Sequence, residues 1–498
     1  PDGASTWRFL AIPTPGAANN VAYAGAIAPV EVSHDGGIYY QPVTVTAACE
    51  TPDVQIYYTT DGTEPYDCSY RPPRGTLYTE PLYVGSMRCL RFRAVRAGWK
   101  DSPIETRTYI INPSAALSGL PIISLVGDPR RTFYEPTGIM AVSGGIYGGG
   151  GWQPVSTTDY NNFMNRGMAY ERPVAFEWIE NGQTDFVMDC GIRVHGSEWI
   201  RPRYRRCDGY WSGDCKISFR LYFRGRYGSS RLEYPLFPFE VDSFKSVVLR
   251  AGHNDRTNPF IKDELLRRLY KDMGNVSTGG TFANVLINGE YKGFYNPTEH
   301  VKSDFCKEWW DTDNEFDVMT MSGIRDGDGA AWSTMLSYAR SHDLRQLAYY
   351  QQFATMLDIP AFADYLILQL WCGNWDWPQN NWSAARERSP NGLWRFFIWD
   401  AEGGMFPDQI YNVRFGELNS QSNGNAELYR ALKYSEMFRQ VWADRYYKHF
   451  YNGGALTTQN ISARFLEMKQ QLLPVIPNMD MYVVNTWTPQ RFSIFRSA

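Results

Sequence analysis

The chain has 498 residues, of which 43% are hydrophobic and 20% are charged, and its net charge is −4. This length predicts two or three domains with room for a large core, and the composition excludes a disordered chain. The near balance of 49 basic and 53 acidic residues gives no electrostatic basis for binding nucleic acid. No apolar run is long enough to span a bilayer. An aromatic content of 15% fits an extracellular or carbohydrate-associated protein, and it also fits aromatic cores.

The first part of the chain predicts a linker followed by a small β-sandwich. Residues 1–25 are rich in Ala, Gly and Pro without periodicity, as expected for a linker or the tail of a preceding domain. Within residues 26–112, "VQIYYTT", "LRFRAVRAG" and "TRTYII" alternate with period 2 between turn signals, which predicts antiparallel strands. The stretches "IYYTTDGTEP", "PLYV" and "LRFRAVRAGW" resemble the β-sandwich module found at the C-terminus of chitobiases and in many secreted proteins, where it usually acts as a spacer.

Residues 113–498 predict a single α+β domain. Strand-like runs with Gly- and Asn-rich loops come first, and helical patterns such as "NPFIKDELLRRLYKDMG" and "IPAFADYLILQLW" follow. The Gly-rich "GGIYGGGGW" lacks the Lys-Ser/Thr ending of a P-loop, so we expect a flexible surface loop there. Strands followed by helices are the general plan of bilobal kinase-like folds, although many other α+β enzymes share it.

Eight cysteines are present, and none of them forms a CxxC pair. The stretch "RCDGYWSGDCK" predicts a small loop closed by a Cys207–Cys215 disulfide, which would stabilise the fold by about 2.5 kcal/mol in the chain-entropy model. The even number fits export, and it also fits reduced thiols.

Two aromatic stretches, "GNWDWPQNNW" and "WRFFIWDAEGG", carry the most informative polar residues. Asp376 and Asn381 have the D-x-x-x-x-N spacing that protein kinases use for a base and a metal ligand, and Pro378 places them on a loop. Asp400 follows a strand-like run, and Glu402 adds a second acid. Phosphoryl transfer needs a carboxylate near the acceptor hydroxyl and oxygen ligands for Mg²⁺. The alternative is structural: Asp376 caps a helix or accepts indole N–H bonds.

Two lysines are candidates for contact with phosphate. Alternation in "CKISFRLYF" places Lys216 on the polar face of a strand, where a solvated lysine is the simpler interpretation. Lys262 falls on the apolar side of the helix predicted over 260–273, next to Asp263. A cation directed inward there needs a partner or a phosphate, unless the side chain snorkels to solvent.

Several further motifs, in the same order along roughly 120–410, resemble the CotH (spore coat protein H) kinase family: "GIRVHGS", "KISFRLYFRGRYGSSRLEYPLF", "VVLRAGHND", "IKDELLRRLYKDMG", "VLINGEYKGFYNPTEHV" and the two aromatic stretches. The resemblance implies an atypical protein-kinase-like bilobal fold that uses ATP and Mg²⁺ (or Mn²⁺) to phosphorylate protein serine or threonine. It implies that Asp376 is the catalytic base, that Asn381 and Asp400 are metal ligands, and that Lys216 contacts phosphate. Glu299 would lie at the ATP cleft.

These observations predict a secreted or cell-surface kinase, with Glu402 as a further metal ligand and Lys262 as a further nucleotide contact. Glu402 stands where the family usually has an aspartate, and an insert precedes Lys216. Both departures support an alternative, a pseudokinase that serves as an adhesion, glycan-binding or scaffold module. A carbohydrate-active enzyme is a third hypothesis, suggested by the sandwich and by the 17 tryptophans.

Overall fold

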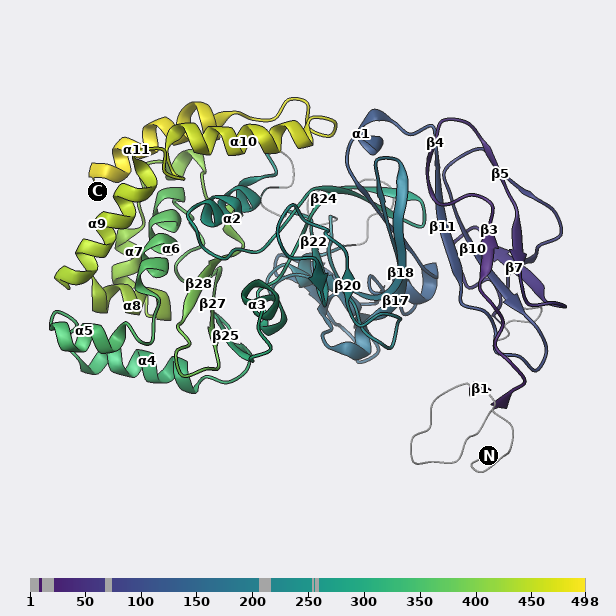
Figure 1. Cartoon of the computed structure of the whole chain (residues 1–498), viewed down its shortest axis with the longest axis horizontal. Coiled ribbons are helices and arrows are strands. Elements are labelled where there is room, and N and C mark those ends of the chain that lie inside the picture. The colour runs from purple at the N-terminus through teal and green to yellow at the C-terminus, as the bar shows by residue number, and fades with distance from the viewer. Residues whose placement is uncertain are drawn as a thin grey trace. The chain divides into compact units, whose positions relative to one another are not determined.

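The computed structural model (Figure 1) describes residues 9–10, 22–67, 74–205, 216–252, 255 and 259–497. It divides the chain into unit 1, Pro1–Ser230 with Ala283–Tyr295, and unit 2, Arg231–Phe282 with Asn296–Ala498.

Unit 1 begins with the β-rich module that the alternating pattern predicts. Its longer strands, β7 (Gln55–Thr59), β10 (Arg88–Val95) and β11 (Glu105–Ile111), coincide with the alternating stretches of the sequence. The central strand β10 pairs antiparallel with both β7 and β11. Inward-facing residues from these strands, including Phe92 and Tyr109, form a buried apolar core. The other strands are β1 (Phe9–Leu10), β2 (Ala22–Tyr23), β3 (Val30–Val32), β4 (Gly37–Tyr39), β5 (Val43–Val45), β6 (Ala47–Cys49), β8 (Thr76–Leu77) and β9 (Leu82–Val84).

The second part of unit 1 is built on a long hairpin. Strands β17 (Arg172–Glu180) and β18 (Gln183–His195) pair antiparallel, β12 (Ile122–Val126) pairs with β17, and β19 (Ser218–Tyr222) pairs with β18. The remaining elements are α1 (Ala115–Ser118), β13 (Val142–Ser143), β14 (Ile146–Gly148), β15 (Gly151–Gln153), β16 (Tyr160–Asn161), β23 (Ala283–Ile287) and the first part of β24 (Glu290–Thr298).

The Gly-rich stretch does not form the surface loop that we expected from its sequence. Strands β14 and β15 pair as a hairpin, with Tyr147 opposite Trp152, and the turn falls between Gly148 and Gly151. Trp152 is 5% exposed and donates its indole N–H to the Gly144 carbonyl, 3.0 Å away. The buried indole thus provides the apolar contact that a short two-stranded ribbon needs.

Unit 2 combines a four-stranded sheet, in the order β26–β25–β27–β28, with most of the helices. The strands are β20 (Leu232–Glu233), β21 (Ser243–Phe244), β22 (Ser246–Arg250), the last part of β24, β25 (Phe316–Thr320), β26 (Gly323–Asp326), β27 (Trp382–Glu387) and β28 (Arg395–Ile398). The helices are α2 (Lys262–Asp272), α3 (Ser303–Trp310), α4 (Ala330–Ser341), α5 (Leu347–Phe353), α6 (Ile359–Cys372), α7 (Phe415–Ser420), α8 (Gly424–Leu432), α9 (Glu436–Phe450), α10 (Thr458–Leu472) and α11 (Thr488–Ser497).

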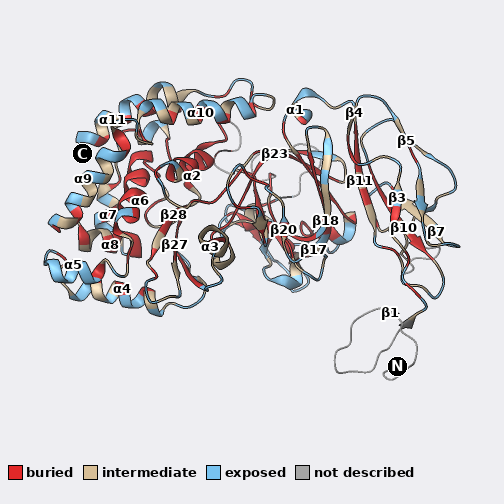
Figure 2. Cartoon of the chain, in the orientation of Figure 1, coloured by how far each residue is buried: buried red, intermediate tan, exposed pale blue. Residues whose placement is uncertain are grey.

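Helix α6 is the apolar centre of unit 2, and Figure 1 shows it between α9 and β28. Nearly every one of its residues is buried (Figure 2), as expected of a helix that is hydrophobic on all sides. The Asp358 side chain caps its start by accepting from the Ala361 N–H at 3.1 Å. Gly373 ends it in the left-handed conformation, with φ of 62°. The chain therefore leaves the core directly into the stretch that contains Asp376.

One buried polar cluster joins α6 to α9. Asp364 on α6 accepts from Arg445 Nε at 2.6 Å, lies 2.8 Å from His449 Nε2, and also accepts from Asn275 Nδ2 at 2.9 Å. Burial alone would raise the pKa of Asp364, but the hydrogen bonds from His449 and Arg445 outweigh it and hold that pKa below its ordinary value.

The structure bears out the mixed α+β composition and the β-rich N-terminal part. The kinase-like bilobal arrangement stays a prediction, as do the domain boundaries. None of the helices in the described part of the chain combines the length and apolar character that crossing a membrane requires.

Candidate active site

The antiparallel hairpin β27–β28 brings Asn381 and Asp400 together. Trp382 at the start of β27 lies opposite Ile398 at the end of β28, so the residues just outside this pair are neighbours. The Asn381 side-chain N–H donates to the Asp400 carbonyl at 3.0 Å. The sequence predicted a loop residue and a strand-end residue, and this register explains why they meet.

Asp376 joins the same group through side-chain amides. Its Oδ1 accepts from Asn380 Nδ2 at 2.7 Å and its Oδ2 accepts from Asn381 Nδ2 at 3.0 Å. The nearby Trp377 indole donates instead to the Tyr365 hydroxyl, at 2.7 Å. The carboxylate of Asp376 is therefore oriented by amides, and the helix-cap and indole-acceptor alternatives do not describe it.

Asn381 and Asp400 both adopt a left-handed backbone conformation, with φ of 56° for each. Residues other than glycine rarely adopt this conformation, and it persists only where surrounding contacts impose it. Asp376 is not strained in this way, but it is half-buried, and burial raises its pKa above the ordinary value with Asp400 adding to the shift. The amide of Asn380 opposes that shift.

Arg250, which lies in the motif "VVLRAGHND" and is not among the predicted site residues, is the central cation of the site. It ends β22, and its Nη2 lies 2.5 Å from Asp400 Oδ1 and 3.4 Å from Glu402 Oε2. Its Nε lies 3.4 Å from Asp263 Oδ2. Burial would lower the pKa of Arg250, but Asp263, Asp400 and Glu402 together raise it. An arginine that closes an apolar strand run is the signal that could have identified it.

Asp263 ties helix α2 to the same loop. Its Oδ1 accepts from the backbone N–H of Ala401 at 2.7 Å, and its Oδ2 accepts from Arg267 Nε at 3.0 Å. Asp263 and Arg267 are i,i+4 neighbours, a spacing that usually describes a solvated helix face. Here α2 is buried along most of its length (Figure 2).

Comparison with family models identifies two parts of the chain. The model of the "CotH kinase protein" family matches residues 192–487, more than half of the chain. The chain belongs to the CotH kinase family. A second family model, "Chitobiase/beta-hexosaminidase C-terminal domain", matches residues 34–106. Both matches confirm the resemblances seen in the motifs, whereas a search of curated proteins finds no match.

Two further side chains of the CotH domain lie against this cluster. Lys262 is buried. Its Nζ lies 3.5 Å from the centre of the Phe406 ring and 4.0 Å from Asp255 Oδ1. With 6% of its side chain exposed, it does not snorkel to solvent. Glu402 is also buried, and burial together with Asp400 raises its pKa to about 8, against the opposing effect of Arg250.

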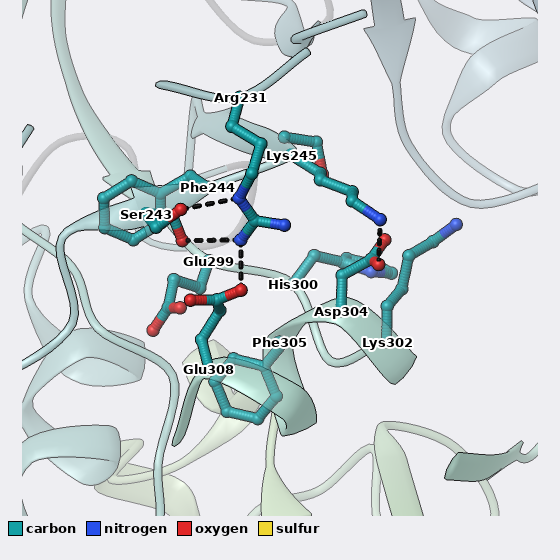
Figure 3. Close-up of a pocket in the computed structure, with 11 residues that line it drawn as sticks. Arg231, Ser243, Phe244, Lys245, Glu299, His300, Lys302, Asp304, Phe305 and Glu308 are labelled. Atoms are coloured by element: carbon teal, nitrogen blue, oxygen red, sulfur yellow. Dashed lines mark hydrogen bonds and ion pairs between the residues drawn. The ribbon is translucent and has the colours of Figure 1, made fainter. Parts of the chain in front are cut away.

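Glu299, predicted at the ATP cleft, lies in a different set of contacts. Its Oε2 accepts from the Gly279 N–H at 2.7 Å and from Trp309 Nε1 at 2.9 Å, and burial raises its pKa to about 7. Figure 3 shows it beside a pocket of unit 2 that also holds two ion pairs, Arg231–Glu308 and Lys245–Asp304. In the described part of the chain, its hydrogen bonds do not reach Asp376, Asn381 or Asp400.

Lys216 belongs to unit 1. Its Nζ donates to the Phe294 carbonyl at 2.7 Å and lies 4.7 Å from the Phe294 ring centre and 4.9 Å from that of Tyr295. Its side chain is thus largely buried, and the solvated-lysine interpretation of this strand is wrong. Its contact with phosphate stays a prediction.

The predicted Cys207–Cys215 disulfide lies outside the described residues. Of the cysteines that the structure does describe, Cys49, Cys89, Cys190, Cys306 and Cys372 are free thiols.

The oxygen atoms available for a metal ion are few. In the described ranges, no three or more His, Cys, Asp or Glu side chains form a group that could hold a metal ion by themselves. Asn381 uses Nδ2 for both of its donated bonds, which leaves Oδ1 as its ligating atom. The side chain of Asp400 is 38% exposed and commits only Oδ1 to Arg250. This small set of oxygens fits Mg²⁺, which usually takes one or two protein ligands and completes its shell with water and phosphate.

Proposed function

We propose that this CotH domain transfers the γ-phosphoryl group of ATP to the hydroxyl group of a protein serine or threonine. The observation that carries the proposal is the Asn381 amide, which bonds to both the Asp376 carboxylate and the Asp400 carbonyl at 3.0 Å. A base and two oxygen ligands are thereby held together by one side chain, and this is the arrangement that phosphoryl transfer requires.

Asp376 is the proposed general base. It takes the proton of the acceptor hydroxyl as the hydroxyl oxygen bonds to the γ-phosphorus, while the bond from that phosphorus to the leaving ADP oxygen breaks. Its raised pKa brings it closer to neutral pH, where proton acceptance in the transition state is most effective. Asn380 and Asn381 hold its carboxylate in one orientation. The carboxylate therefore loses little conformational freedom when the acceptor binds.

Asn381 Oδ1 and Asp400 Oδ2 are the proposed ligands of Mg²⁺ or Mn²⁺. When bound, the ion would neutralise charge on the nucleotide phosphates. Lys216 keeps its proposed contact with phosphate on the strength of its place in the family-like strand, and Lys262 contributes positive charge beside the acids. Glu299 and Glu402 are assigned to structural contacts in this proposal.

Phosphate transfer from γ-labelled ATP tests the proposal, with autophosphorylation and casein as the two acceptors and Mg²⁺ or Mn²⁺ present. We expect Asp376→Asn to reduce the transfer rate by about 10²- to 10⁴-fold, the usual contribution of a general base. The matched control is Asp444→Asn, an exposed acid of unit 2 on α9 whose side chain bonds only to Gln440 among the described residues. Equal rates for wild type and both variants would contradict the proposal.

The ion pair between Arg250 and Asp400 supports a second candidate, a pseudokinase that acts as a binding module. In that case no label transfer occurs with either metal, and MgATP does not raise the melting temperature, because only a ligand of the folded state stabilises it. Glycan binding that survives Asp376→Asn would favour this candidate.

We also propose that the protein acts outside the cytoplasm. The support is its sandwich module, which is typical of secreted multidomain proteins. Fractionation of the producing cells, with detection of the chain in the medium or at the surface, tests this proposal. Recovery in the cytoplasm alone would contradict it.

A further inference from the structure

We propose that Arg250 is a permanent cation in the place of a second metal ion, so that the site takes one divalent ion instead of two. This inference rests on the proposed function, because it concerns the metal that would accompany ATP. Many phosphoryl-transfer enzymes, protein kinases among them, use two ions to neutralise developing charge. Here part of that charge is supplied by a side chain.

The position of Arg250 is tightly determined. It lies at the end of β22, directly opposite Asn296 of β24, and only 9% of its side chain is exposed. Asp263 fixes its Nε from the side of α2, and the Trp399 ring centre lies 5.1 Å from its guanidinium carbon. If the guanidinium swung out to solvent, the buried Asp263 carboxylate would lose one of its two arginine partners, and Asp400 would lose its ion pair.

Arg250 occupies the space where a second ion would bind. Such an ion would have to bridge Asp400 and Glu402, at about 2.1 Å from their oxygens. The Arg250 Nη2 already lies 2.5 Å from Asp400 Oδ1 and 3.4 Å from Glu402 Oε2. An ion about 2.1 Å from Asp400 Oδ1 would lie at most about 4.6 Å from the Arg250 Nη2, because that nitrogen is 2.5 Å from the same oxygen. The guanidinium does not lose its proton, so the two positive charges would repel each other.

The remaining donors suffice for one ion. Asn381 Oδ1 and Asp400 Oδ2 are two protein oxygens that do not contact Arg250, and their residues lie side by side at the open end of the β27–β28 hairpin. Phosphate oxygens and water would complete an octahedral shell around a single Mg²⁺. Glu402, a predicted metal ligand, would then serve to hold Arg250.

Equilibrium dialysis of the full chain against Mn²⁺, with a saturating non-hydrolysable ATP analogue, counts the bound ions directly. We expect one Mn²⁺ per chain for the wild type. Arg250→Met, which removes the charge at similar length, should raise this number to two, and electron paramagnetic resonance should show the broadening caused by two neighbouring ions. Arg250→Lys keeps a cation at the position and should still bind one.

The outcomes separate this inference from the proposed function. Two ions bound to the wild type would overturn the inference and leave the kinase proposal standing, whereas no bound ion would overturn both. One ion in folded Arg250→Met would show that Arg250 does not exclude the second ion. Circular dichroism reports whether that variant folds. If it does not fold, the numbers of Mn²⁺ bound by the wild type and by Arg250→Lys still test the inference.

Discussion

Replacing Asp263 by asparagine tests whether buried charge pairs hold α2 against the site. The carboxylate is 7% exposed and meets three groups: the Ala401 N–H at 2.7 Å, Arg267 Nε at 3.0 Å and Arg250 Nε at 3.4 Å. Asparagine can keep the bond from Ala401 through its oxygen. Its amide N–H groups would face the two guanidinium groups, which are donors as well, and those two contacts would be lost.

The expected cost follows from these contacts. A hydrogen bond to a charged group contributes about 1.5–3 kcal/mol, and the Arg250 contact is the longer of the two, so we expect a loss of about 3 kcal/mol. Arg267 keeps Glu264 as a partner and Arg250 keeps Asp400, which limits the loss. For a unit of this size, that free energy lowers the melting temperature by roughly 6–12 °C.

Thermal unfolding followed by circular dichroism and calorimetry measures this change. The matched control is Asp272→Asn, because Asp272 lies on the same helix but pairs with Arg464 at the surface, where both side chains are 30% exposed. Surface pairs contribute about 0–1 kcal/mol, so the control should melt within a few degrees of the wild type. If the two variants melt at the same temperature, the buried charges of α2 do not hold the unit together as argued.

Two further substitutions address side chains whose predicted roles the contacts leave open. In the folded chain the pKa of Glu299 is about 7, against an ordinary value of 4.5. Between these two pH values the folded chain keeps a proton on Glu299 that the unfolded chain releases. The free energy of unfolding should therefore fall as the pH rises from 4.5 to about 7. Glu299→Gln should flatten that fall in urea unfolding compared at about pH 5 and about pH 8; parallel curves would contradict the assignment. Lys216→Met should raise the KM for ATP by roughly 10- to 100-fold if its ammonium contacts phosphate. An unchanged KM, equal to that of the exposed control Lys448→Met, would exclude that contact.

Much of the fold could be predicted because its signals are local. Period-2 alternation located β7, β10 and β11, and a helical apolar run located α6. The Gly-rich hairpin could not be predicted, because its apolar contact is the buried Trp152 indole, and the burial of a side chain is a tertiary property.

For the candidate site, the sequence alone determined which side chains are candidates for the chemistry. The spacing of Asp376 and Asn381 is set by one loop, and Asp400 is marked by the strand that precedes it, so both signals lie within a short stretch of chain. The family motifs depend on the same short stretches.

Only the tertiary structure decided what surrounds those side chains. Arg250 and Asp400 are 150 positions apart, and Asp263 and Ala401 are 138 positions apart, so no local pattern connects them. A strand-end arginine and an i,i+4 acid–base pair are ordinary surface features in a sequence. They become the internal charges of a site here because α2 and β22 are buried, and burial depends on packing that involves the whole unit.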